Sequence, residues 1–161
     1  MSGFLDNLTS FYQERLARLR NRPFLKATMA ASALVAIADG SVTFSQRMRM
    51  DQILETLTAL KVFDPHEGVD LFNDYVREIL DSPKEGREAA IRAITAGARD
   101  EESKRLMIRV CLAISEASGE IGLVEQIEIV SLCSLLGVDP GTCGLYTDVS
   151  PRDIALPAVG K

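Results

Sequence analysis

The sequence predicts an all-α fold, a single-domain bundle of about seven helices with an internal pseudo-twofold helix-turn-helix repeat. Apolar residues recur at three- and four-residue steps along most of the chain. The segment Ala38-Asp39-Gly40-Ser41-Val42 is echoed about 79 residues later by Ala117-Ser118-Gly119-Glu120-Ile121, and each lies between two apolar helical runs. A chain of 161 residues is long enough to bury one core without disulfides or metal. Together these observations predict a duplicated helix-turn-helix within one domain.

The first two helices flank a proline. Residues 1–21 have the apolar spacing of an amphipathic helix, and Asn21-Arg22-Pro23 is predicted to break it, because proline disfavours helix continuation. Residues 24–38 are almost continuously apolar and small, which predicts a central helix. Gly40 suits the left-handed conformation that ends such a helix.

The next two helices have clear start signals. Thr43 or Ser45 is the expected N-cap of a helix that runs to about Leu60. The apolar stripe of this helix includes Met48. A further helix over 65–81 begins with proline at its first position.

Three helices are predicted in the second half. Ser82 is expected to cap a helix over 83–97 through a capping box with Glu85. The second copy of the repeat then comprises helices over 103–117 and 124–136.

The domain is therefore predicted to span residues 1–145. Its repeat halves cover about 24–65 and 103–140, with a helical hairpin over 66–98 between them. Residues 146–161 contain prolines and glycines with little periodicity and are expected to form a loose tail.

Charge and hydropathy exclude several classes of protein. The net charge of −5 argues against nucleic acid, which requires a concentrated basic face. No apolar stretch is long enough to span a bilayer, and the N-terminus lacks a secretory signal. We therefore expect a cytoplasmic protein that acts away from nucleic acid.

The N-terminal segment is locally basic. Arg15, Arg18, Arg22 and Lys26 occur where acidic residues are few. This pattern is typical of a solvated helix face, and it also fits a contact surface for an anionic membrane or an acidic partner.

The two turns are the candidate ligand sites. Asp39 lies in the first turn, while Glu116, Glu120 and Glu125 lie in and after the second. Carboxylate oxygens are the ligands that hard divalent cations prefer, but neither turn has the alternating acids of a calcium loop. The alternative is that Asp39 and Gly40 only end a helix.

No catalytic arrangement is visible, so we expect no enzyme and no catalytic residues. His66, the only histidine, falls at a predicted helix start, where a solvated role is expected. Cys111, Cys133 and Cys143 form no Cys-x-x-Cys or Cys/His cluster, which predicts reduced and mostly buried thiols.

The residues at the two turns resemble the tellurite-resistance TerB family, which includes TerB-like domains of membrane-linked bacterial proteins. The resemblance extends over residues 1–145 and rests on short motifs in a fixed order. These are Ala38-Asp39-Gly40-Ser41-Val42, Leu60-Lys61-Val62-Phe63-Asp64, Ala117-Ser118-Gly119-Glu120-Ile121, Glu125, and Leu136-Gly137-Val138-Asp139-Pro140.

The resemblance implies an all-α fold with this pseudo-symmetry and a cytoplasmic role in tellurite resistance and stress response. It also implies a divalent-metal site at the turns, to which Asp39 and Glu125 carry over. Ser45 and Gln46 stand where the family usually has acids, and Ser118 stands where it has Asp.

The resulting functional expectation is a non-enzymatic protein-interaction module, placed at the cytoplasmic membrane face. The expected partners are other tellurite-resistance or membrane-associated proteins, or an anionic membrane surface. The alternative is a divalent-metal-binding protein that uses the acids of the two turns.

Overall fold

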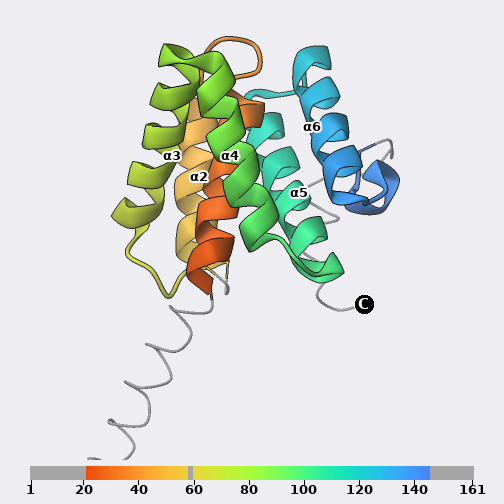
Figure 1. Ribbon diagram of the computed structural model, residues 1–161. Coiled ribbons are helices and arrows are strands. Elements are labelled where there is room, and N and C mark those ends of the chain that lie inside the picture. Colours follow the sequence, from red (N-terminus) through yellow and green to blue (C-terminus); the bar gives the residue numbers. More distant parts are fainter. Residues whose placement is uncertain (1–20, 58–59, 146–161) are drawn as a thin grey trace, which may run out of the picture.

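The computed structural model describes residues 21–57 and 60–145, and all regular structure within them is helical (Figure 1). The predicted all-α fold is thereby confirmed. A helix covers residues 21–36, and it is followed by α2 (Phe44–Thr56), α3 (Pro65–Asp81), α4 (Pro83–Gly97), α5 (Glu101–Ser115) and α6 (Leu123–Leu136). Two 3₁₀ helices, η1 (Glu116–Ser118) and η2 (Pro140–Cys143), follow α5 and α6. The helix predicted upstream of residue 21 and the tail predicted over 146–161 lie outside the described residues.

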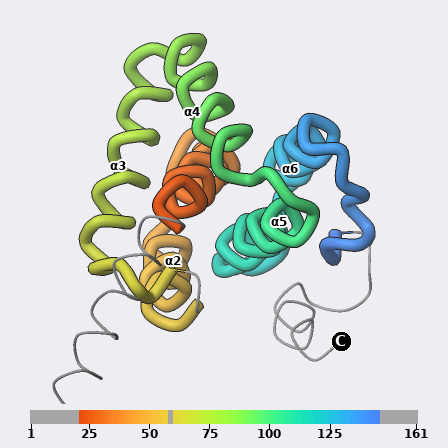
Figure 2. Tube along the Cα trace, turned by 60° about the horizontal axis from the view of Figure 1, so that its bottom comes forward, coloured from red at the N-terminus to blue at the C-terminus, as the bar shows by residue number. Residues whose placement is uncertain are grey.

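The helix over 21–36 is the centre of the bundle (Figure 2). Every residue from 27 to 36 is buried, as expected for a helix without a polar face. The end of α4 packs directly on this helix at Pro23, because a Cβ atom on Gly97 would lie 2.0 Å from the carbonyl oxygen of Pro23. α5 packs against both α2 and α6, and α6 lies at one edge of the molecule (Figures 1 and 2).

Side-chain capping explains where α2, α3 and α5 begin. Thr43 is the N-cap of α2 through a complete capping box with Gln46. Asp64 caps α3 by accepting a hydrogen bond from the backbone N–H of His66 (3.0 Å). The predicted bounds of α3 and α4 are confirmed, whereas the capping box predicted at Ser82 is wrong, since its side chain makes no capping hydrogen bond.

Two other predicted boundaries are also wrong. The predicted break at Asn21-Arg22-Pro23 is absent because these residues are helical, and the fixed φ of proline is compatible with helical geometry. α2 ends at Thr56 rather than near Leu60. Leu60 reaches the core from a turn, so its apolar character reflects burial and not helical periodicity.

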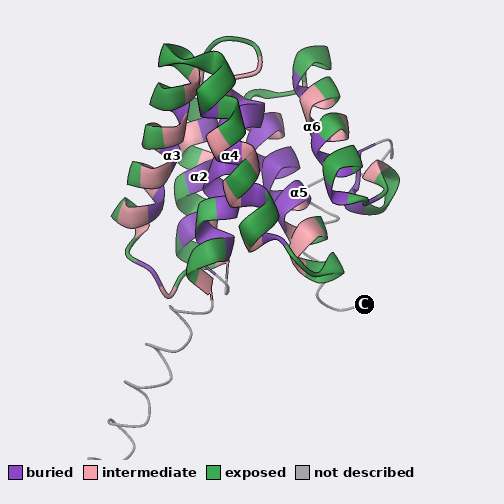
Figure 3. Ribbon diagram, in the orientation of Figure 1, coloured by how far each residue is buried: buried purple, intermediate pink, exposed green. Residues whose placement is uncertain are grey.

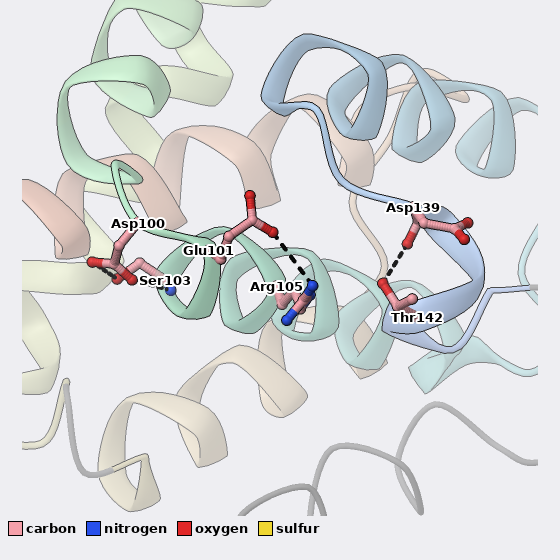
Figure 4. A network of polar contacts seen from close by, with 6 residues as sticks. All are labelled: Asp100, Glu101, Ser103, Arg105, Asp139 and Thr142. Carbon is pink, nitrogen blue, oxygen red and sulfur yellow. Dashed lines mark hydrogen bonds and ion pairs between the residues drawn. The ribbon is translucent and has the colours of Figure 1, made fainter.

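A short polar network fixes the start of α5 (Figure 4). The Asp100 carboxylate accepts from the backbone N–H of Ser103 (2.8 Å) and from its hydroxyl (3.1 Å). These hydrogen bonds hold the pKa of Asp100 below its usual value. Glu101 pairs with Arg105 one turn later (3.4 Å). α5 therefore begins two residues before the predicted Ser103, at Glu101, where Asp100 is the N-cap.

Candidate functional site: the junction of the two turns

The two turns singled out by the sequence lie side by side at one end of the bundle (Figure 1). Gly40 and Gly119 have φ values of 102° and 120°, which L-residues with side chains rarely adopt. The hydroxyl oxygens of Thr43 and Ser118 are 2.5 Å apart and share a hydrogen bond. Each turn thus brings the start of the following helix to the junction.

The centre of the junction is a buried contact between Gln46 and Glu125. The amide Nε2 of Gln46 donates to Oε2 of Glu125 (3.1 Å), and the two residues are 3% and 6% exposed. Gln46 Oε1 accepts from the backbone N–H of Thr43 (3.0 Å), which leaves the amide nitrogen to face Glu125. The third residue of α2 is therefore hydrogen-bonded to the third residue of α6.

Glu125 is electrostatically perturbed. Burial raises the pKa of its carboxyl group above the usual value, and the negative charge of Asp39 raises it further. The hydrogen bond from the Gln46 side chain and the nearby Gly122 backbone oppose this rise. The ionisation of Glu125 is therefore coupled to its burial and to the charge of Asp39.

Arg49 links α2 to the end of α5. Its Nη1 donates to the carbonyl oxygen of Ala113 (2.9 Å) and lies 3.5 Å from the Glu116 carboxylate. The side chains of Arg49 and Glu116 are only 18% and 10% exposed. A cation here satisfies a carbonyl of the last turn of α5 and complements the negative end of its dipole.

The predicted metal residues are only partly brought together. Asp39 and Glu125 are close enough to influence one another, while Glu116 pairs with Arg49 and Glu120 is exposed in the second turn. Within residues 21–57 and 60–145, no three or more His, Cys, Asp or Glu side chains form a group suited to a metal ion. Gln46, which stands at a position where the resemblance implies an acid, donates an N–H to Glu125 instead.

Sequence reasoning missed how the junction is held together. Gln46 and Glu125 are 79 positions apart, which is the period of the predicted repeat, so they occupy equivalent places in its two copies. This equivalent placement is the feature of the sequence that could have indicated their contact. No comparable signal in the sequence indicated the contact of Arg49 with Ala113.

Only the end of the predicted basic surface lies within the described residues. Arg22 forms an ion pair with Glu67 (3.1 Å), and Lys26 is exposed, while Arg15 and Arg18 lie outside the described residues. A cleft of about 430 Å³ is lined by Arg22, Lys26, Pro23, Ala93 and Ala96. The described part of this surface therefore combines positive charge with an apolar floor.

The remaining side chains singled out by the sequence are the histidine and the three cysteines. His66 is exposed in the first turn of α3. Cys111, Cys133 and Cys143 are buried, and burial raises the pKa of the Cys111 thiol to about 12. None of the described helices combines the length and apolar character needed to cross a membrane.

The fold and the junction define an all-α bundle in which α2 and α6, the helices that follow the two turns, are joined by a buried hydrogen bond. Residues 25–145 match the family model described as Tellurite resistance protein TerB, and the chain belongs to this family. It is 29% identical to the "Tellurium resistance protein TerB" of Alcaligenes sp over 106 residues, which are 64% of this chain and 87% of that protein. No solved structure matches the chain.

Proposed function

We propose that this protein contributes to tellurite resistance as a non-enzymatic interaction module. Membership of the TerB family, across most of the described domain, is the observation that carries the proposal. The name of the Alcaligenes relative supports the same role. The side chains of Gln46, Glu125 and Arg49 are hydrogen-bonded within the fold, which favours a scaffold over a reaction site.

Growth on tellurite tests this role. A bacterium that loses tellurite tolerance when its own TerB-family gene is deleted is supplied with this chain. We expect the chain to restore growth on tellurite, whereas an empty vector does not. A chain that accumulates as folded protein and leaves the strain as sensitive as the vector control contradicts the proposal.

We further propose that the basic N-terminal surface contacts an anionic membrane. The exposed Lys26 and the apolar floor of the adjacent cleft support this role, because anionic lipid headgroups attract cationic side chains beside apolar surface. Arg22 contributes less than the sequence indicates, since Glu67 neutralises part of its charge.

Vesicle co-sedimentation at low salt tests this contact. Arg15→Glu, Arg18→Glu and Arg22→Glu together should weaken binding to phosphatidylglycerol vesicles relative to the wild type. A matched control reverses Arg77, Lys84 and Arg92, three exposed cations on α3 and α4, and changes the net charge equally. Equal binding by the wild type and the N-terminal variant, or equal loss in both variants, contradicts a localised membrane contact.

A divalent cation at the junction is the second candidate function. The observation that favours it is the proximity of Asp39 and Glu125, whose negative charges a cation would offset. The described side chains do not provide a preformed set of three acids, so any binding should be weak. Calorimetric titration with calcium, magnesium, manganese and zinc, using Asp39→Asn as the control, decides the matter. An absence of heat at millimolar metal removes this candidate.

A further inference from the structure

Three cysteines, Cys111, Cys133 and Cys143, meet in one part of the core. They come from α5, α6 and η2, and each is at most 1% exposed. η2 packs against both helices, and the sides of α5 and α6 that face each other are buried (Figures 1 and 3). The three thiols are close enough to influence one another electrostatically. Nucleophilic side chains from three separate elements are thus gathered at one place, and the proposed function uses none of them.

The turn after α6 brings Cys143 back to Cys133. Gly137 ends α6 in the left-handed conformation (φ 72°), and a backbone hydrogen bond to the Cys133 carbonyl (3.0 Å) completes this turn. Asp139 is the N-cap of η2, and its carbonyl oxygen accepts from the Thr142 hydroxyl (2.8 Å) (Figure 4). As a result, the thiols of Cys133 and Cys143 lie within hydrogen-bonding reach of each other.

The two neighbouring thiols differ in how firmly they hold a proton. The contact with Cys133 lowers the pKa of the Cys143 thiol below its usual value, and the positive charges of Arg109 and Arg105 lower it further, while burial opposes this shift. The same contact and burial raise the pKa of the Cys133 thiol. Among the described residues, the buried Nε atom of Arg109 has no hydrogen-bond partner, which leaves one donor free for a neighbouring anion. Cys143 is therefore the thiol that ionises, and Cys133 is the one that keeps its proton.

We propose that Cys133 and Cys143 form a reversible disulfide within one chain when the protein meets a peroxide. The Cys143 thiolate attacks one oxygen of hydrogen peroxide, the O–O bond breaks, and the departing hydroxide takes up the proton that Cys143 had released. The product is a sulfenic acid on Cys143. The Cys133 sulfur then attacks the Cys143 sulfur, the S–O bond breaks, and the oxygen leaves as water with the proton of Cys133. Two thiols thereby lose two electrons and two protons to one peroxide, which becomes two waters. This inference is independent of the proposed function.

The position of Cys143 explains how a buried thiol can react. It lies in a 3₁₀ helix of four residues, and its neighbours Gly141 and Thr142 are exposed. Local opening of so short a helix costs less free energy than opening of α5, where Cys111 lies. Burial raises the pKa of the Cys111 thiol to about 12, so this thiol should stay reduced. The expected order is reaction of Cys143 first and Cys133 second, with Cys111 left as an internal control.

Titration of free thiols in the full, reduced chain tests the pair. Native protein treated with a small excess of hydrogen peroxide should lose two of its three thiols, and peptide mapping should join Cys133 to Cys143. Dithiothreitol should then restore both thiols. Protein unfolded in urea should lose this selectivity, because only the fold holds these two sulfur atoms together. Gel electrophoresis without reductant should show a monomer, since the disulfide lies within one chain.

Serine substitutions separate the roles of the three thiols. Cys143→Ser should slow the loss of the first thiol at least about tenfold, and Cys133→Ser should leave a sulfenic acid that dimedone traps. The matched control is Cys111→Ser, since Cys111 and Cys143 are both 0% exposed, and it should form the disulfide at the wild-type rate. Circular dichroism establishes that the variants are folded.

The wild-type chain alone is enough to overturn the proposal. Retention of all three thiols in native protein contradicts it, as does a disulfide that includes Cys111. Oxidation of Cys143 to a sulfinic acid without a disulfide also contradicts it, because Cys133 would then be unable to reach the sulfenic acid. Equal slowing by Cys111→Ser and Cys143→Ser would show that the reaction does not begin at Cys143.

Discussion

Gln46 and Glu125 are 79 positions apart in the chain and are joined by a buried hydrogen bond of 3.1 Å. Gln46 also accepts from the Thr43 backbone, so one amide caps α2 and holds α6. The two turns are therefore parts of one junction. Where the resemblance implies acids around these turns, an amide and a carboxyl here hydrogen-bond to each other directly.

Replacement of Arg49 tests the link between α2 and α5. Arg49→Met keeps much of the side-chain volume but removes the donor to the Ala113 carbonyl and the partner of Glu116. We expect the free energy of unfolding in urea to fall by about 1–3 kcal/mol. Arg77→Met is the control, because the Arg77 side chain is 67% exposed and should matter little. Similar effects of the two substitutions contradict a special role for Arg49.

The conformation of the second turn requires glycine at position 119. Gly119 has φ 120° and ψ −138°, a region that residues with a Cβ atom avoid. Gly119→Ala should therefore lower the free energy of unfolding by about 1–3 kcal/mol, although a Cβ atom there would meet nothing within 4 Å. Urea unfolding measures the change. A neutral or stabilising substitution would show that the turn adopts a different conformation.

Ionisation of Glu125 should make stability depend on pH. Burial and the charge of Asp39 raise its pKa in the folded state, so the folded protein retains this proton to higher pH than the unfolded chain. The free energy of unfolding should then decrease as pH rises from the usual carboxyl pKa through the raised one. Glu125→Gln cannot titrate and should lack this decrease.

The difference in unfolding free energy between the wild type and Glu125→Gln, followed against pH, isolates this effect. Wild-type stability should decline relative to the variant as pH rises through the window. Asp39→Asn should narrow that window, because it removes the second cause of the raised pKa. A difference that is flat with pH, or that grows in favour of the wild type, rules out the raised pKa.

The local parts of this fold could be predicted from the sequence, and the contacts across it could not. Proline at the first helical position marks where α3 and α4 begin, since this signal acts within one turn of helix. Met48 was expected in the apolar stripe of α2, yet it is 51% exposed. The buried residues of α2 are Gln46, Met50 and Leu54, and the burial of the polar Gln46 against Glu125 is a tertiary contact that hydropathy does not encode.

The metal hypothesis can be tested by restoring an acid at the junction. Gln46→Glu would place a third carboxyl beside Asp39 and Glu125 and remove the N–H that Glu125 accepts. We expect lower thermal stability without metal, because like charges are then buried together. Millimolar magnesium or manganese should recover more stability in this variant than in the wild type. An equal response of the two proteins to metal would contradict cation binding at the junction.

A double-mutant cycle between Gln46 and Glu125 tests the central claim most directly. The free energies of unfolding of the wild type, Gln46→Ala, Glu125→Ala and the double variant are measured in urea at neutral pH. If the two turns form one junction through this contact, the coupling energy should be about 1 kcal/mol or more. Additive effects of the two substitutions, with a coupling energy near zero, would contradict it.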